Sequence, residues 1–298
     1  MKRIMLILFT ISALSVSAKT PNEFGIYGAG GYTFFYQSKL NDVHGVSSGG
    51  FGGDLGVSFT GFFTEQFGFH IGLGVGIYNV KNVVDSFAFV TPDYGYELNP
   101  LVEGEKHYYD LYTGLYGYSE KHTMFFITIP LMLQFQTPHR LRSSVERGFY
   151  ASAGVKLNYL INTQYDVGVE TFKNVAHFKE IDNWGGTQEF AGFGRFKGNT
   201  SSGKLGNFIP LLSLETGIKW CFPHRFILYT GVFFEYGLND LTKNDRDDFN
   251  NYTSKNDFET LSLLKFSDKT NIMSAGIKLR LAFVNNKTGH ELLCPKFK

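Results

Sequence analysis

The chain has 298 residues, a formal net charge of +1 and an aromatic content of 17%. A net charge this close to zero gives no electrostatic reason to expect a nucleic-acid partner. Two cysteines are too few for a disulfide framework or a cysteine-rich zinc site. No apolar run of about 18 residues follows the N-terminal segment, so no transmembrane helix is expected.

Residues 1–18 have the pattern of a secretory signal peptide. A basic pair, Lys2-Arg3, precedes the apolar run 4–14, and small residues occupy 16–18. Residue 19 is a lysine rather than a cysteine, so processing as a lipoprotein is not indicated. The sequence therefore predicts an exported protein whose mature chain begins at Lys19.

Three strands are predicted in the first part of the mature chain. Residues 24–36 are rich in glycine and tyrosine, and residues 50–59 alternate apolar residues with small or acidic ones. Residues 67–78 give the cleanest repeat, with large apolar residues on one face and mostly glycines on the other. That division is typical of a strand with a lipid-facing exterior and a crowded interior.

Two further strands, 125–135 and 149–161, follow a long polar stretch at 81–122 that we expect to be a loop. Pro130 lies inside the first of them. Because proline cannot donate to the ladder, it predicts a bulge or a locally lost hydrogen bond.

A hairpin at 208–236 is the strongest local signal in the sequence. Apolar residues alternate with small or charged ones in 212–220 and again in 226–236, on either side of a turn. Arms of about 9–11 tilted residues are long enough to cross a bilayer. The last predicted strand is 272–283, with apolar residues outward and basic residues inward.

The lengths of the connections decide the architecture. Connections after the first, third, fifth and seventh strands have roughly 13, 42, 43 and 32 residues, and the others are short. Outer-membrane barrels have short periplasmic turns and long extracellular loops. We therefore predict an all-β fold, an antiparallel up-and-down transmembrane β-barrel of eight strands in the outer membrane, over residues 19–284. Ten strands are the alternative, if part of 88–118 forms an extra hairpin. Residues 285–298 would be a periplasmic tail.

Two segments carry a resemblance to a known family. Residues 127–133 (ITIPLML) and 148–160 (GFYASAGVKLNYL) make this chain similar to the PorT-like outer-membrane β-barrel proteins of Bacteroidota. The resemblance implies an OmpA-type outer-membrane barrel and no single shared activity. Phe283 is followed by about fifteen further residues, whereas many outer-membrane proteins end on an aromatic residue that recruits the barrel-assembly machinery.

Charged residues lie on the faces predicted to point inward. A barrel of about eight strands has an interior that side chains can fill, and unpaired charges there are costly. We therefore predict an ion-pair network and a lumen that conducts no solute. A row of hydrated charges lining a narrow channel is the alternative. The predicted network consists of Asp54, Lys156, Glu215, Lys219, Glu235, Lys278 and Arg280.

The segment 164–206 is unusually aromatic for a loop. It could present a docking surface for a ligand or partner, or it could fold back and pack on the barrel mouth, which the sequence favours. The residues concerned are Trp184, Phe190, Phe193 and Phe196.

Histidines raise the question of an enzyme, because small barrels include lipid A-modifying enzymes. His107, His122 and His177 fall in predicted outer loops, with Asp110 and Glu180 nearby in sequence. No ordered catalytic triad motif accompanies them. We therefore expect no enzymatic activity, no cofactor and no metal site.

Cys221 is predicted at the periplasmic end of the sixth strand, and Cys294 in the tail that starts from the same rim. The topology allows a disulfide there, but a bridge needs Cα atoms within about 7 Å, which a sequence cannot establish.

The function expected is a structural or protein-interaction role in the envelope, with membership of a secretion or assembly complex as its sharper form. A small passive porin is the alternative, and a lipid A-modifying enzyme ranks third. Expected partners are outer-membrane lipids, the barrel-assembly machinery during biogenesis, and envelope proteins at the extracellular loops or the periplasmic rim.

Overall fold

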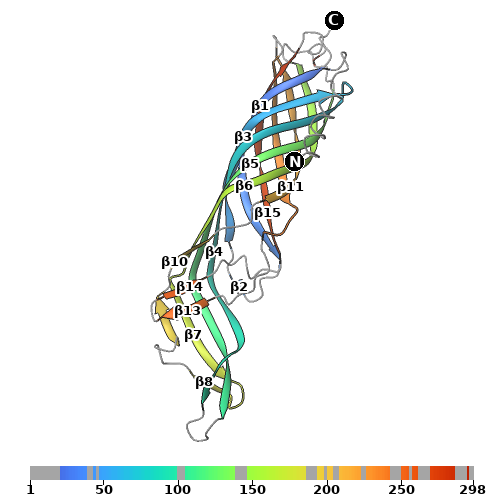
Figure 1. Ribbon diagram of the computed structural model, residues 1–298. Coiled ribbons are helices and arrows are strands. Elements are labelled where there is room, and N and C mark those ends of the chain that lie inside the picture. Colours follow the sequence, from blue (N-terminus) through green and yellow to red (C-terminus); the bar gives the residue numbers. More distant parts are fainter. Residues whose placement is uncertain are drawn as a thin grey trace, which may run out of the picture.

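A computed structural model gives the arrangement of the chain (Figure 1). It describes residues 21–38, 43–44, 47–98, 105–137, 146–185, 193–197, 200–203, 208–222, 226–241, 250–254, 257–260, 269–285 and 294. The predicted signal peptide, Phe190 and most of the predicted tail lie outside these residues.

Eight strands form a closed ring in which every neighbouring pair is antiparallel. The first and last strands of the ring close it, with pairing from Glu23↔Val284 to Ser38↔Lys269. The predicted antiparallel eight-stranded barrel is confirmed. In ring order the strands are β1 (Asn22–Ser38), β3 (Ser47–Phe62), β4 (Phe67–Leu98), β5 (Lys106–Gln136), β6 (Glu146–Gly168), β11 (Phe208–Cys221), β12 (Phe226–Gly237) and β15 (Lys269–Val284).

The prediction of a loop at 81–122 was wrong. Strands β4 and β5 have 32 and 31 residues and continue far beyond the barrel as one hairpin (Figure 1). The ten-strand alternative is also wrong, because the described residues within 88–118 lengthen two existing strands and add none to the ring. Tyrosine, valine and phenylalanine are frequent in this polar stretch, and they favour strands.

Shorter strands join this hairpin to form a structure that we call the extension. β7 pairs with β5, β8 and β9 pair with β7, β10 pairs with β6, and β2 pairs with β4. A separate two-stranded sheet consists of β13 (Asn250–Ser254) and β14 (Asp257–Thr260). The strands of the extension are β2 (Val43–His44), β7 (Thr171–Phe178), β8 (Asn183–Gly185), β9 (Gly194–Lys197) and β10 (Thr200–Gly203), with the outer parts of β4, β5 and β6.

Pro130 interrupts one ladder without shifting it. Between β4 and β5 the pairing stops after Ile71↔Leu131 and resumes at Gly74↔Thr128 in the same register. Of the two predicted outcomes, the locally lost hydrogen bond is therefore confirmed, and the β4–β5 pairing has no bulge at Pro130.

The barrel is apolar outside and polar inside. Large apolar side chains on the outer face are widely exposed, such as Leu55 (65%), Leu133 (62%) and Ile277 (64%). Charged residues such as Glu215 and Arg280 are buried on the inner face. The alternation therefore has the orientation that the sequence predicts.

Among the described residues, no helix has the length and hydropathy needed to span a membrane.

The extension has a hydrophobic core of its own. Because it lies beyond the barrel, this core is separate from the lumen. The larger cluster contains Val84, Phe87, Leu115, Tyr118, Tyr165, Val167, Val169, Phe172 and Phe196. A smaller one contains Leu111, Ala176, Phe178 and Phe193.

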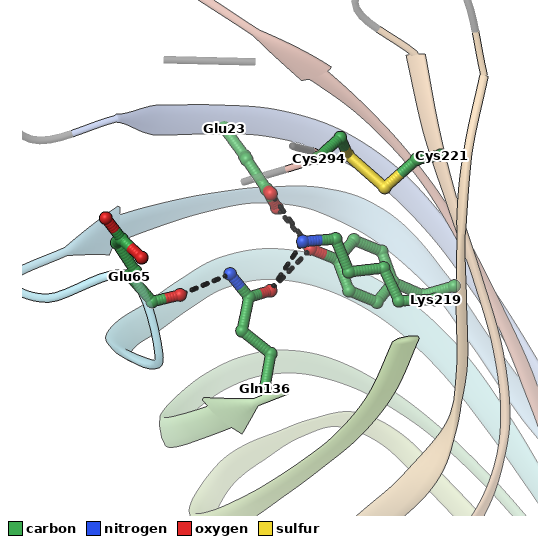
Figure 2. Close-up of a disulfide and its surroundings, with 7 residues drawn as sticks. Glu23, Glu65, Gln136, Lys219, Cys221 and Cys294 are labelled. Carbon is green, nitrogen blue, oxygen red and sulfur yellow. Dashed lines mark hydrogen bonds between the residues drawn. A yellow bond between two sulfur atoms is a disulfide. The ribbon is translucent and has the colours of Figure 1, made fainter. Parts of the chain in front are cut away.

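The first and the last strand of the ring begin and end at the same rim, which is the rim with the short turns. Asn22 and Val284 lie there beside the turns that link β3 to β4 and β11 to β12. A disulfide between Cys221 and Cys294 ties the tail to this rim, with Cα atoms 6.0 Å apart (Figure 2). The bridge that the topology allowed is therefore formed.

Candidate functional site

Acids and bases balance inside the barrel. Leaving aside Asp110 and Glu120 on the outer part of β5, the buried acids of the described ring strands are Glu23, Asp54, Glu215 and Glu235, and the buried bases are Lys156, Lys219, Lys278 and Arg280. Four of each sign give no net charge. Every one of the seven predicted network residues lies inside the lumen, and the contacts divide them into four groups.

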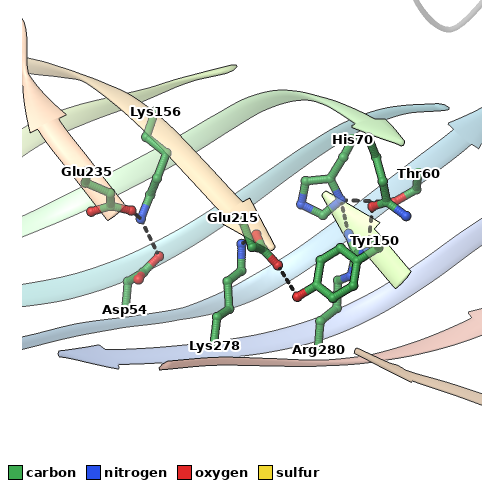
Figure 3. Close-up of polar contacts among 10 residues, drawn as sticks. Asp54, Thr60, His70, Tyr150, Lys156, Glu215, Glu235, Lys278 and Arg280 are labelled. Atoms are coloured by element: carbon green, nitrogen blue, oxygen red, sulfur yellow. Dashed lines mark hydrogen bonds and ion pairs between the residues drawn. The ribbon is translucent and has the colours of Figure 1, made fainter. Parts of the chain in front are cut away.

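The group nearest the extension centres on Lys156. Its Nζ lies 2.6 Å from Glu235 Oε1 and 3.2 Å from Asp54 Oδ2 (Figure 3). The Tyr78 hydroxyl donates to the other Glu235 oxygen at 3.1 Å. One ammonium group therefore bridges two carboxylates from different strands.

The second group pairs Lys278 with Glu215. Lys278 Nζ lies 2.7 Å from Glu215 Oε2, and the Tyr150 hydroxyl donates to Glu215 Oε1 at 2.8 Å (Figure 3). The ammonium group also lies 5.0 Å from the centre of the Tyr27 ring. Each carboxylate oxygen therefore has a partner, as a buried charge requires.

The third group centres on Arg280, and its contacts in this group are with neutral side chains. It donates to His70 Nδ1 and to Gln134 Oε1, both at 2.6 Å. Because a guanidinium can only donate, His70 accepts at Nδ1 and carries its proton on Nε2. The Tyr229 ring lies 4.0 Å from Arg280 Cζ and adds a cation–π contact.

The fourth group lies next to the disulfide at the rim. Tyr229 donates to Glu23 Oε1 at 2.8 Å, and Lys219 donates to Gln136 Oε1 at 3.1 Å (Figure 2). Gln136 in turn donates to the backbone oxygen of Glu65 at 3.0 Å, which joins the lumen to the β3–β4 turn.

Apolar and aromatic side chains pack among these charges at both ends of the lumen. At the end nearest the extension the cluster is Phe35, Tyr78, Val80, Met124, Phe126, Leu160, Ile209, Leu211 and Ile272. At the rim the cluster is Phe62, Tyr150, Ile227, Tyr229, Ala282, Val284 and Cys294.

Glycines make room for this filling. A Cβ added at Gly76 would lie 2.5 Å from a ring carbon of Phe126, and one at Gly72 would lie 3.0 Å from Pro130 Cγ. The glycine face of the repeat at 67–78 therefore points into a crowded interior, as its sequence predicts.

A closed antiparallel ring with an apolar exterior and a charged interior is the form in which strands cross the outer membrane. The protein is an outer-membrane β-barrel. Because outer-membrane barrels have short periplasmic turns and long extracellular loops, we expect the rim with the short turns and the disulfide to be periplasmic and the extension to be extracellular.

Comparisons with known proteins add little to this assignment. No family model matches the sequence, and no curated protein matches it. The outer-membrane protein OprG of Pseudomonas aeruginosa is 12% identical, with 89% of this chain and 97% of that chain covered and a TM-score of 0.35. Ail of Yersinia pestis, solved with the heparin analogue sucrose octasulfate, is 10% identical, with coverages of 88% and 99% and a TM-score of 0.27. The assignment rests on the strand pairing and exposure of this chain.

Two of the aromatic residues predicted as a docking surface belong to the extension core instead. Phe193 and Phe196 are buried, and the Phe196 ring stacks on Phe172 at 5.4 Å. The prediction of a docking surface formed by all four residues is therefore wrong, because Phe193 and Phe196 are buried in the core of the extension. Trp184 is 55% exposed.

A polar cluster in the extension consists of Asp93 of β4, Asp110 of β5 and Lys179, which directly follows β7. Lys179 Nζ lies 2.8 Å from Asp110 Oδ1, and the Asp93 backbone amide donates to that oxygen at 3.0 Å. The Lys179 hydrogen bond, helped by this amide, holds the pKa of Asp110 below its usual value. The same hydrogen bond raises the pKa of Lys179.

The three histidines that raised the question of an enzyme have structural partners. His107 Nδ1 lies 2.9 Å from Glu180, and His177 Nε2 lies 3.1 Å from Asp182. His122 is fully buried, 3.1 Å from Glu120, with the Phe35 ring against it. Within the described ranges, neither His107 nor His177 hydrogen-bonds a serine hydroxyl, and no group of three or more His, Cys, Asp or Glu could hold a metal ion.

Sequence reasoning missed Glu23 and the lumen tyrosines. Glu23 has the same parity along β1 as Tyr27, so it faces inward, but it lies just outside the predicted strand. The tyrosines were missed because an aromatic residue in a barrel strand suggests a lipid-facing position. Their hydroxyl groups, which need buried partners, were the available signal.

Proposed function

We propose that the protein is a closed barrel that anchors an extracellular β-sheet and presents it to other molecules. The observation that carries this proposal is the unbroken passage of β4 and β5 from the membrane into an extension with its own core. A core indicates a folded, displayed structure rather than a connecting loop.

The filled lumen supports the closed state and disfavours a passive porin. Eight charges of balanced sign occupy the interior, and apolar side chains pack across both ends. An eight-stranded barrel is narrow enough for side chains to fill it completely.

Conductance in a planar bilayer tests the closed lumen. We expect no steady channel current from the full-length protein. A reproducible wild-type current would overturn this part of the proposal and favour the small passive porin.

A truncated barrel tests the role of the extension. Val83 pairs with Ser119 and Gly168 pairs with Thr200, so an Asn-Gly turn can join the members of each pair. We expect this variant to insert in the membrane but to lose partners that co-purify with the full-length protein. Retention of every partner would overturn the role of the extension.

We further propose that the partners include members of a secretion or envelope-assembly complex. The resemblance of residues 127–133 and 148–160 to PorT-like proteins supports this narrower proposal. A partner retained by the truncated barrel would instead bind the periplasmic rim. The barrel-assembly machinery is the proposed partner during insertion.

We also propose that the protein is not an enzyme, and the burial of His122 supports this view. Lipid A mass spectra from cells with and without the gene should be identical. A modified lipid A species that depends on the protein would contradict this.

A further inference from the structure

A row of side chains crosses three strands of the extension on one face. Asp110 of β5 pairs with His177 of β7, and His177 pairs with Trp184 of β8. Directly opposed residues share a face of the sheet, so these three side chains lie side by side. Tyr112, two residues from Asp110, shares that face and contacts Trp184.

The indole of Trp184 is exposed but held in place. The His177 ring stacks on it with centroids 4.3 Å apart, and the Tyr112 ring lies 4.8 Å from it. His177 is itself held by Asp182 at 3.1 Å. A large aromatic surface that is fixed and over half exposed is suited to a ligand that stacks on it.

Exposed polar groups that can bind hydroxyls lie in the same part of the extension as this ring. The side chains of Asp182, Asp93 and Lys179 are 91%, 76% and 53% exposed, and Lys179 is paired with the buried Asp110. Carboxylates accept hydrogen bonds from hydroxyl groups, and the lysine can donate to hydroxyl oxygens.

The backbone is strained at the same place. Asp93 has a φ of 50° and Asp182 a φ of 45°, and no other non-glycine residue in the described ranges has a positive φ. Residues in this region of φ/ψ space often mark functional sites. Both residues contact the row of side chains on this face. The Asp93 backbone amide donates to Asp110, and Asp182 hydrogen-bonds His177.

We propose that Trp184 and the groups around it bind a neutral sugar of an extracellular polysaccharide. The C–H face of a pyranose ring stacks on an indole, and its hydroxyls match the aspartates and lysine at the edge. Asp93 and Asp182 are exposed, whereas Lys179 is paired with the buried Asp110, so the site has an acidic edge that disfavours sulfated or uronic-acid chains. This proposal rests on the role of the extension given above and names a ligand class for it.

Tryptophan fluorescence of the full-length protein in detergent micelles tests the proposal directly. The chain has two tryptophans, and Trp220 lies at the periplasmic end. W220F leaves Trp184 as the sole indole within a wild-type site. Titration should use neutral oligosaccharides of glucose, mannose, galactose and N-acetylglucosamine, with dextran sulfate as the polyanion.

We expect a saturable change in Trp184 emission with at least one neutral oligosaccharide, and little change with dextran sulfate. No saturable change with any neutral sugar, or a stronger response to dextran sulfate, would overturn the proposal. Neither result depends on a variant of the site, so a folding defect there cannot obscure the answer.

Variants then test the residues. W184A should weaken binding by about tenfold or more, measured by equilibrium dialysis. Tyr36→Ala, which removes an equally exposed aromatic ring from β1, should leave affinity within about twofold. Equal binding by W184A and wild type would place the sugar elsewhere. If sugar binding fails while the truncated barrel still loses its partners, only the sugar proposal falls.

Discussion

Lys278 Nζ lies 2.7 Å from Glu215 Oε2, although β15 and β11 are separated in the ring by β12. The pair therefore bridges β15 and β11 inside the lumen, across the intervening strand β12. Such a contact links parts of the wall that share no backbone hydrogen bonds.

Glu215→Ala should destabilise the barrel by about 3–5 kcal/mol, because it leaves the Lys278 ammonium buried without its carboxylate. Urea unfolding in detergent, followed by heat-modifiable gel mobility, would measure the loss. Glu65→Ala, which removes an exposed acid from a periplasmic turn, is the matched control and should change little. The double variant E215Q/K278M should recover much of the loss, and a double variant as unstable as E215A would argue against ion pairing as the cause.

Removal of the disulfide should cost about 4 kcal/mol in the chain-entropy description, since the bridge closes a loop between residues 73 positions apart. Reduction of the wild-type protein and C221S/C294S should give the same lowered unfolding midpoint. A midpoint that does not respond to reductant would show that the bridge does not stabilise the folded barrel.

Gly76→Ala should destabilise the barrel by about 1–3 kcal/mol through overpacking. The added Cβ would lie 2.5 Å from the Phe126 ring and 2.6 Å from the Gly53 carbonyl oxygen. Gly28→Ala is the control, because a Cβ there meets nothing within 4 Å. Similar losses at both positions would indicate a general effect of removing glycine from a strand.

Acid should release the Asp93 backbone amide from Asp110, at the place where the β4–β5 register shifts between Thr91 and Gly95. The pKa of Asp110 is lowered by Lys179, so this contact stabilises the extension above the ordinary carboxyl pKa of 3.8 and is lost as the pH falls through the lowered value. Hydrogen exchange should show the Asp93 amide still protected at the ordinary carboxyl pKa of 3.8 and unprotected only at lower pH. Lys179→Met should move this loss of protection to higher pH, and an unchanged profile would contradict the assignment.

The barrel could be predicted from sequence because its strands alternate cleanly. Residues 67–78 show this best, with apolar residues toward lipid and small ones toward the lumen. The extension could not be predicted, because its inward positions mix Asn82 and Glu120 with Val84 and Tyr118, and all four are buried. Polar residues inside a small core hide the period that hydropathy detects.

The charged residues of the lumen were predictable from parity, but their partners were not. Parity along each strand places Lys156, Glu215 and Lys278 inside. Strand tilt and stagger decide which residues meet, so the contact of Lys156 with both Asp54 and Glu235 needed the fold. The disulfide is similar, since the sequence places both cysteines at one rim and only the fold shows them 6.0 Å apart.

The pairing of β1 with β15 sets an order of assembly. Because the first and last strands of the ring are partners, the wall cannot close until the end of the chain has arrived. Tyr229 meets Glu23, and Arg280 meets His70, only across that late joint. A barrel halted one strand early would hold unmatched charges along an open edge. Closure of the wall and completion of these two interior contacts are therefore a single, late event in biogenesis.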